Sequence, residues 1–181
     1  MPSPCVILDR DGVINHDSDH YIRSLGEWQP IAGSIEAIGM LSRAGYKVYV
    51  ATNQSGLARG LLETSVLEQM HAELHRLVSK EGGEVSDIIY CPHGPEDGCH
   101  CRKPSPGMYQ TLAATHGFDL AGIPVIGDSL RDLQAAEAVA ALPMLVETGK
   151  GERTLRLRPD LDYPTFPDLY AAAQHIIFNA L

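Results

Sequence analysis

The sequence VILDRDGVIN, residues 6–15, places a short apolar run immediately before two carboxylates and a glycine turn. The apolar run predicts a buried strand, and Asp9 and Asp11 follow it two positions apart. Because the chain curls at the end of a strand, both carboxylates can face one crevice beyond a sheet. Two carboxylates this close repel each other, and a divalent cation such as Mg²⁺ would relieve the repulsion. The pattern is short, so a polar loop after a buried strand is the alternative.

The same arrangement recurs twice along the chain, which favours a functional site over a chance pattern. The apolar run 47–51 leads into Thr52 and a polar glycine turn, and the run 124–126 leads into Gly127 and Asp128. Ligands of open α/β sheets bind at the carboxyl ends of the strands, so these turns are expected to meet at one pocket. Lys103, at the start of a predicted helix, supplies a cation for it.

Apolar runs of strand length alternate with segments of helical periodicity through most of the chain. This alternation predicts an α/β fold, a doubly wound, Rossmann-like parallel sheet with helices on both faces. We expect one domain over residues 1–181, since this length suits one buried core. The predicted strands are 5–8, 47–51, 87–90, 124–126 and 144–146, and the predicted helices are 34–44, 64–80, 106–116, 130–140 and 167–179.

The chain carries a formal net charge of -9, which argues against a nucleic-acid or acidic-membrane partner. An anionic substrate would need cations concentrated locally. No stretch has the pattern of a secretion signal or the length of an apolar membrane span, so we expect a cytoplasmic protein. We also expect it to be a monomer.

Three of the four cysteines fall in one short segment with a histidine. Cys91, His93, Cys99 and Cys101 offer three sulfurs and one imidazole, the ligand set of a closed tetrahedral zinc site. Such a Zn²⁺ would be structural and would fix the loop before Lys103. The alternatives are a redox pair of Cys99 with Cys101, or reduced cysteines without a metal.

In the order Asp-x-Asp-Gly, Thr, Lys and Gly-Asp-x-x-x-Asp, the motifs of this chain resemble those of the haloacid dehalogenase superfamily of phosphohydrolases. The resemblance covers almost the whole chain. It implies a haloacid dehalogenase-like fold and a Mg²⁺-dependent phosphatase. Residues 15–29 are too few for a folded cap domain, so a minimal cap with a zinc-binding loop is expected.

The resemblance also implies roles for individual residues. Asp9 would be the nucleophile that forms an aspartyl phosphate, and Asp11 the general acid and base. Thr52 and Lys103 would stabilise the phosphoryl group, while Mg²⁺ would be held by Asp9, Asp11 and Asp128. The two carboxyls would need environments that drive their pKa values apart.

The substrate implied by the resemblance is a small sugar bisphosphate. Arg102 would recognise the part of the substrate that is not cleaved, for which a planar guanidinium is suited. The remaining substrate-binding residues implied are Asp17, Ser18, Asp19, His20, Asn53, Gln54 and Ser55.

Several assignments stay open at this level. Asp132 either orients Ser129 or the waters of the metal ion, or is a first-turn carboxylate favoured by the helix dipole. The segment 150–153 lies either at the rim of the pocket or in a solvated loop. Arg10 is expected, by strand alternation, to point away from Asp9 and Asp11.

Two other functions compete with a sugar bisphosphatase. A histidinol-phosphate phosphatase shares the zinc-loop spacing and the Arg102-Lys103 pair, although the segment 55–60 favours the sugar enzyme. A phospho-receiver signalling domain is also doubly wound and uses Mg²⁺. Its phosphorylated Asp follows a later central strand, and here the third strand leads into Cys91.

Overall fold

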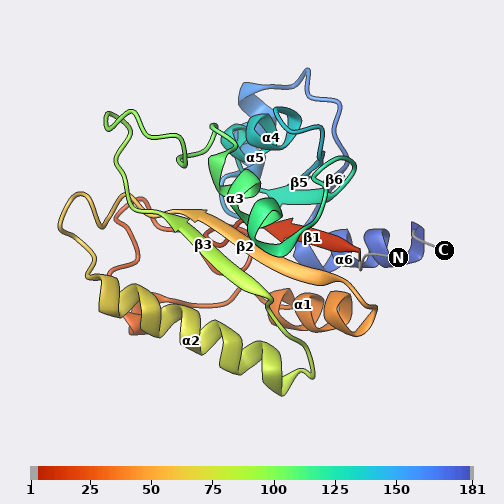
Figure 1. The fold of residues 1–181 in the computed structure, drawn as a ribbon, viewed down its shortest axis with the longest axis horizontal. Helices are drawn as coiled ribbons and strands as arrows, with labels where there is room; N and C mark the ends of the chain where they lie inside the picture. Colours follow the sequence, from red (N-terminus) through yellow and green to blue (C-terminus); the bar gives the residue numbers. More distant parts are fainter. Residues whose placement is uncertain (1–3, 180–181) are drawn as a thin grey trace.

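The computed structural model describes residues 4–179, in which six parallel strands form one sheet (Figure 1). The strand order is β3-β2-β1-β4-β5-β6, so the first strand of the chain lies in the centre. The strands are β1 Cys5–Leu8, β2 Lys47–Asn53, β3 Asp87–Cys91, β4 Pro124–Gly127, β5 Leu142–Val146 and β6 Thr165–Phe166.

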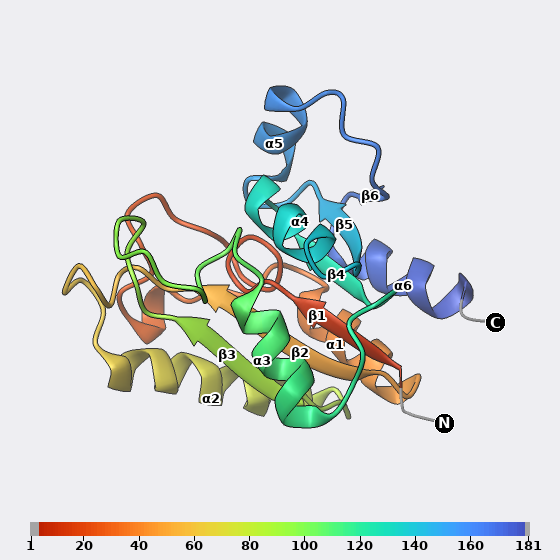
Figure 2. The ribbon, with the colours of Figure 1, turned by 45° about the horizontal axis from the view of Figure 1, so that its top comes forward.

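Helices cover both faces of the sheet, as Figure 2 shows from a second direction. Because strand side chains alternate, Val6 and Leu8 face one core with α1, α2 and α6, while Ile7 faces the other with α3 and α4. The helices are α1 Ser34–Arg43, α2 Thr64–Lys80, α3 Gly107–His116, α4 Leu130–Glu137, α5 Gly151–Leu157 and α6 Leu169–Asn179.

The predicted doubly wound fold is confirmed, and the bounds of β1 and α2 match the predicted ones. The sequence prediction was incomplete after β5, where it proposed neither α5 nor β6. Only Gly151 and Thr154 are buried in α5, so this helix has no apolar stripe to reveal it. The strand β6 has two residues, which is too short for a periodic signal.

The segment between β1 and α1 is a loop with one short 3-10 turn, Leu25–Glu27. Ile22 and Trp28 are buried and anchor the segment to the core below it. No helix or strand of a cap domain occurs between residues 15 and 29, which agrees with the minimal cap that the sequence implies.

A hollow lies at the amino ends of the strands, and Pro4 and Asn179 both line it. These first and last described residues therefore lie close together, on the side opposite the strand arrowheads (Figures 1 and 2). Within residues 4–179, no helix is both long enough and apolar enough to cross a bilayer.

Candidate active site

The carboxyl ends of β1, β2 and β4 meet at one pocket, as the sequence predicts. Asp9 and Asp11 follow β1, Thr52 is in β2, Asp128 follows β4, and Lys103 reaches in from the loop before α3. All five line this pocket, whose volume is about 80 Å³. That is room for a few groups the size of water, enough for a phosphoryl group and an ion but not for a whole sugar.

Lys103 is the buried cation of the pocket, with 3% of its side chain exposed. Its Nζ lies 2.9 Å from Asp9 Oδ1 and 2.6 Å from Asp132 Oδ1, and it donates to the carbonyl of Ala51 at 2.8 Å. Asn53 holds the backbone of Lys103 by two hydrogen bonds of 3.1 Å, one donated and one accepted by its side-chain amide. The ammonium is therefore fixed by β2 before any ligand binds.

Two glycines allow Asp128 to approach the end of β1 closely. A Cβ on Gly12 would lie 2.0 Å from Asp128 Oδ2, and one on Gly149 would lie 2.3 Å from the same oxygen. Both glycines also have positive φ angles, 86° and 58°. The same oxygen accepts the backbone N–H of Lys150 at 2.8 Å, which leaves Oδ1 as the less engaged oxygen.

Burial and crowding of carboxylates make the pocket deficient in positive charge. Burial raises the pKa of Asp9 to about 7, with a further contribution from Asp132 that Lys103 opposes. Burial, together with Asp9 and Asp132, also raises the pKa of Asp128 well above its usual range. Lys103 is the buried cation beside these carboxylates, and a bound metal ion would favour the ionised forms of Asp9 and Asp128.

The donor set fits a hard divalent cation. Carboxylate oxygens of Asp9, Asp128 and Asp132 all lie within 4.8 Å of one another. Asp132 is engaged elsewhere, because its Oδ1 pairs with Lys103 and its Oδ2 accepts from the backbone N–H and the hydroxyl of Ser129. The geometry shows both roles considered for Asp132, because it accepts from Ser129 and is also the first-turn carboxylate of a capping box.

The expectation that Arg10 points away from Asp11 is wrong. Arg10 Nε donates to Asp11 Oδ1 at 2.9 Å, and a second guanidinium nitrogen lies 2.8 Å from the same oxygen. Strand alternation fails here because the chain leaves β1 at Leu8 and turns at Gly12. Burial would raise the pKa of Asp11, but Arg10 and the hydrogen bonds from Asn15 and Gln54 outweigh it and lower that pKa.

The residues predicted to bind substrate are distributed around this pocket. Asp17 and Asn53 line it, and Gln54 donates to Asp11 Oδ2 and to Thr52 Oγ1, both at 2.9 Å. Ser18 and Asp19 line an adjoining hollow, whereas His20 and Ser55 line neither.

Arg102 lies outside the pocket of Asp9, in a neighbouring cleft that Lys103 also lines. Its guanidinium donates to the carbonyl of His93 at 3.2 Å. Arg131, on α4, lines both the pocket and this cleft, and it lies close enough to Arg102 to lower its pKa, although burial is the larger cause. Arg131 was not among the residues expected from the sequence. Its place three residues after Asp128, in the first turn of a helix beside a strand end, was the available signal.

Lys150 lies at the rim of the pocket, which decides between the two interpretations of the segment 150–153. Its Nζ lies 2.9 Å from Asp17 Oδ2, so a cation that follows β5 meets a carboxylate of the β1–α1 loop. Arg153 lines the adjoining hollow with Asp19. Lys150 and Arg153 therefore lie beside the site and not in a solvated loop away from it.

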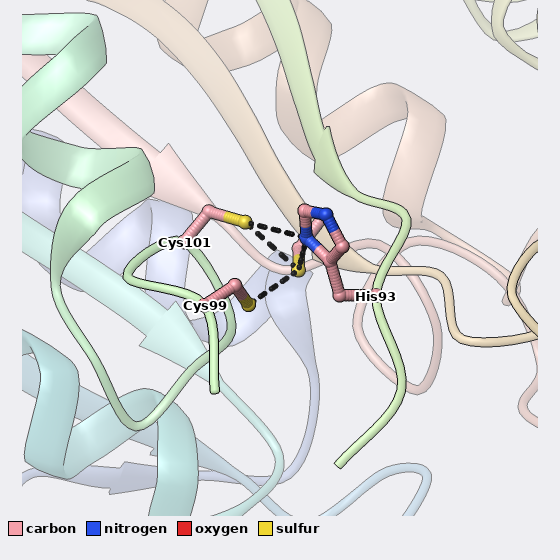
Figure 3. Close-up of side chains that lie close together, drawn as sticks. His93, Cys99 and Cys101 are labelled. Carbon is pink, nitrogen blue, oxygen red and sulfur yellow. Dashed lines mark hydrogen bonds between the residues drawn. The ribbon is translucent and has the colours of Figure 1, made fainter. Parts of the chain in front are cut away.

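The cysteine and histidine side chains of the loop after β3 converge on one point, as Figure 3 shows for His93, Cys99 and Cys101. The ligand atoms of these three residues and Cys91 all lie within 4.8 Å of one another. Sγ of Cys91 lies 3.0 Å from Sγ of Cys101 and 3.6 Å from that of Cys99. Three sulfurs and one imidazole at this spacing could hold a Zn²⁺ ion with no open position.

Two protein families match the chain. Residues 7–125 match the family described as polynucleotide kinase 3 phosphatase, and residues 100–172 match the family described as HAD-hydrolase-like. Together these segments include every residue of the pocket named above.

Several relatives match over nearly the full length. A D-glycero-beta-D-manno-heptose-1,7-bisphosphate 7-phosphatase of Pseudomonas aeruginosa is 56% identical, over 98% of this chain and 99% of its own. The one from Bordetella bronchiseptica is 54% identical over 83% of this chain and 84% of its own.

Among solved structures, the D,D-heptose 1,7-bisphosphate phosphatase of B. bronchiseptica, complexed with magnesium and phosphate, has a TM-score of 0.94 and 48% identity. The alignment covers 97% of this chain and 99% of that chain. The motifs quoted from the sequence, including the segment 55–60, had favoured the same enzyme over a histidinol-phosphate phosphatase, and that resemblance is confirmed. The chain belongs to the D-glycero-beta-D-manno-heptose-1,7-bisphosphate 7-phosphatase family of HAD-like hydrolases.

Proposed function

We propose that this protein is a Mg²⁺-dependent phosphatase that removes the C7 phosphate of D-glycero-beta-D-manno-heptose 1,7-bisphosphate. The observation that carries the proposal is the convergence of Asp9, Asp11, Thr52, Lys103 and Asp128 on one small pocket. The names of the full-length relatives supply the substrate and its beta anomer. By resemblance, the product is used to make nucleotide-activated heptose for lipopolysaccharide core or a related surface glycan.

The chain offers a group for each requirement of phosphate ester hydrolysis. Asp9 attacks phosphorus and becomes an aspartyl phosphate, and Asp11 donates a proton to the ester oxygen that leaves. Asp11 then takes a proton from the water that hydrolyses the aspartyl phosphate. Thr52 and Lys103 hold the phosphoryl oxygens, for which the buried ammonium is already in place.

Asp9, Asp128 and the backbone carbonyl of Asp11 are the groups proposed to hold Mg²⁺. When bound, the ion would neutralise charge on the transferring phosphoryl group. Without ligands, the pKa of Asp9 is raised and that of Asp11 is lowered, opposite to what their roles require. Asp9 ionises more readily beside a cation and Asp11 is protonated more readily beside a phosphate dianion, so the loaded site favours the catalytic states.

The distal phosphate of the substrate is proposed to lie outside the pocket of Asp9, toward Arg102 and Arg131. Their two guanidinium groups border one cleft. In residues 4–179, neither forms an ion pair with a carboxylate within 4.0 Å. A cytoplasmic location and a monomeric state stay predictions from the sequence.

Phosphate release from four substrates tests this function. Heptose 1,7-bisphosphate should be cleaved with the highest kcat/KM, ahead of fructose bisphosphate, histidinol phosphate and a terminally phosphorylated oligonucleotide. A preference for histidinol phosphate would overturn the substrate. The variant Asp9→Asn should keep its fold by circular dichroism and lose activity by at least about 10⁴-fold, as expected for a missing nucleophile. Normal turnover in that variant would overturn the mechanism.

A further inference from the structure

Arg10 is the largest fully buried side chain of the protein, and the proposed reaction gives it no role. It stands between Asp9 and Asp11 in sequence, and its relative exposure is 0%. A buried guanidinium is costly unless it is paired and hydrogen-bonded. Within residues 4–179, Asp11 is the one carboxylate that pairs with it.

The guanidinium contacts a single oxygen of that carboxylate. Nε and a terminal nitrogen of Arg10 lie 2.9 Å and 2.8 Å from Asp11 Oδ1, and Asn15 Nδ2 donates to the same oxygen at 2.9 Å. Nε of Arg10 and Nδ2 of Asn15 thus donate hydrogen bonds to Oδ1, and the terminal nitrogen of Arg10 is in ion-pair contact with the same oxygen. The other oxygen, Oδ2, has one hydrogen bond from a protein side chain, the 2.9 Å bond from Gln54.

The opposite edge of the guanidinium is anchored in the core beside α2. The remaining terminal nitrogen lies 3.3 Å from His71 Nε2 and 3.8 Å from the sulfur of Met70, which is fully buried. Burial, reinforced by the charge of Arg10, lowers the pKa of His71 to about 4, so this imidazole is neutral and can accept from Arg10. Arg10 is therefore held at both ends and cannot follow Asp11 if that side chain rotates.

The asymmetry between the two oxygens has a chemical consequence. Two hydrogen bonds and the second guanidinium contact occupy Oδ1, so this oxygen has no lone pair left for a proton, whereas Oδ2 keeps that capacity. Gln54 connects Oδ2 to Thr52 Oγ1, the hydroxyl proposed to hold the phosphoryl group. Oδ2 is therefore the oxygen on the side of Thr52, where the proposed function places the phosphoryl group.

We propose that Arg10 is a positioning residue that reserves Oδ2 of Asp11 for the proton exchanged during the reaction. The proposal rests on the proposed function. The proton on Oδ2 passes to the ester oxygen as the bond from that oxygen to phosphorus breaks. In the second step a water proton returns to Oδ2 as the water oxygen bonds to phosphorus, and Asp9 leaves as a carboxylate.

The test compares two leaving groups in single-turnover experiments with Arg10→Met. A sugar alkoxide needs the proton from Asp11, whereas nitrophenolate, from p-nitrophenyl phosphate, leaves without one. We expect the rate of release from the sugar bisphosphate to fall about a hundredfold, and release of nitrophenolate to stay within about threefold of wild type. KM for the sugar bisphosphate should change little, since Arg10 does not line the pocket.

Matched variants separate positioning from a general loss of structure. Arg76→Met, at an exposed arginine of α2 that pairs with Glu73, should leave both rates unchanged. In an Asp11→Asn background, Arg10→Met should cause no further loss, because the two residues act through one step. Should Arg10→Met not fold, Arg10→Lys keeps the buried charge without the two-pronged contact and should show the same selective loss.

An equal loss on both substrates, or no loss on either, would overturn the role of Arg10. So would a full additional loss in the Asp11→Asn background. Failure of the wild-type protein to cleave the sugar bisphosphate while it releases nitrophenolate would instead contradict the proposed substrate, and the comparison would then use an alkyl phosphate that the protein does cleave.

Discussion

The carboxylate pocket and the cysteine–histidine loop both gather ligand atoms within 4.8 Å, but they are supported differently. The pocket residues follow buried strands, and protein groups already fix most of them, as Lys103 shows. The loop between β3 and α3, residues 92–106, has no helix or strand and no Leu, Ile, Val or Phe. The fourth ligand, Cys91, is the last residue of β3 and lies in the core, against which Cys99 and Cys101 pack. The four ligand side chains also contact one another.

This difference separates two uses of a metal ion. Packed strands preform the pocket at the cost of crowding buried carboxylates, so a cation there relieves repulsion within an existing shape. The loop has too little apolar surface to order itself, so an ion there would supply the folding energy. Removing charge should therefore stabilise the metal-free pocket, whereas removing a ligand should destabilise the loop.

The largest effect is expected in the pH dependence of stability. The pKa of Asp9 is about 7 in the folded protein and near 4 when unfolded, so the folded state holds more protons between these values. In Mg²⁺-free buffer the contribution of Asp9 to the free energy of unfolding should thus fall as pH rises from about 4 to about 7, by an amount on the order of 4 kcal/mol. His71, whose pKa burial lowers to about 4, contributes in the opposite sense, so the contribution of Asp9 is read from the difference between wild type and a variant without this carboxyl. Asp128, also raised, adds in the same sense.

Urea unfolding of wild type and Asp9→Asn across this pH range measures that contribution. The variant should lack the decrease in the free energy of unfolding that Asp9 causes, and it should be the more stable protein at neutral pH. Asp162→Asn, at an exposed carboxylate, serves as the control and should follow wild type. Parallel curves for wild type and Asp9→Asn would show that the pocket is not under electrostatic strain.

The next effect concerns the loop. We expect about one tightly held zinc ion per chain, and Cys99→Ala should lose it together with about 3 kcal/mol of stability, or about 10 °C in Tm. Activity should fall as well, because Lys103 follows the last ligand by two residues. Metal analysis, calorimetry and phosphate release provide the three measurements.

Cys5→Ala is the matched control, since Cys5 lies in β1, outside the loop. It should keep the zinc and show only a modest packing loss. A preparation that contains no zinc and is fully active would contradict a structural ion in the loop.

The smallest effect tests how closely Asp128 is held. Gly149→Ala would place a Cβ 2.3 Å from Asp128 Oδ2 and 2.4 Å from the Cα of Gly12. Displacement of Asp128 should weaken Mg²⁺ binding about tenfold, or about 1.4 kcal/mol, as measured by titration calorimetry. Gly122→Ala introduces a side chain at a similar positive φ with open space around it, so it should cost stability and leave Mg²⁺ affinity unchanged. Equal affinities in both variants would argue that Asp128 is not a ligand.

Much of the fold was predictable because apolar runs mark the strands and glycines follow the ends of several helices. Apolar segments before Asp9, Thr52 and Asp128 predict buried strands that end near these residues. Because the strands pair in parallel, their carboxyl ends meet at a common pocket. The helix α5 was not predictable, since its burial comes from Gly151 and Thr154 and not from an apolar stripe. A single domain over the full length stays a prediction.

The contacts that tune the site were harder to predict than the residues that form it. The orientation of the Arg10 side chain depends on how the chain turns after β1, and its partner His71 is about sixty residues away in sequence. Arg131 is one exposed arginine among others until α4 places it beside the pocket. Local patterns specify which side chains lie at strand ends, whereas these pairings depend on the packing of distant elements.

The hollow shared by Pro4 and Asn179 has a practical consequence for the use of this protein. Because both lie at the amino ends of the strands, an affinity tag, a fusion partner or a link to a solid support attached beyond either one would leave the pocket facing away from it. The same proximity suits a circularly permuted version, in which a short peptide joins the two ends and new termini open in a surface loop.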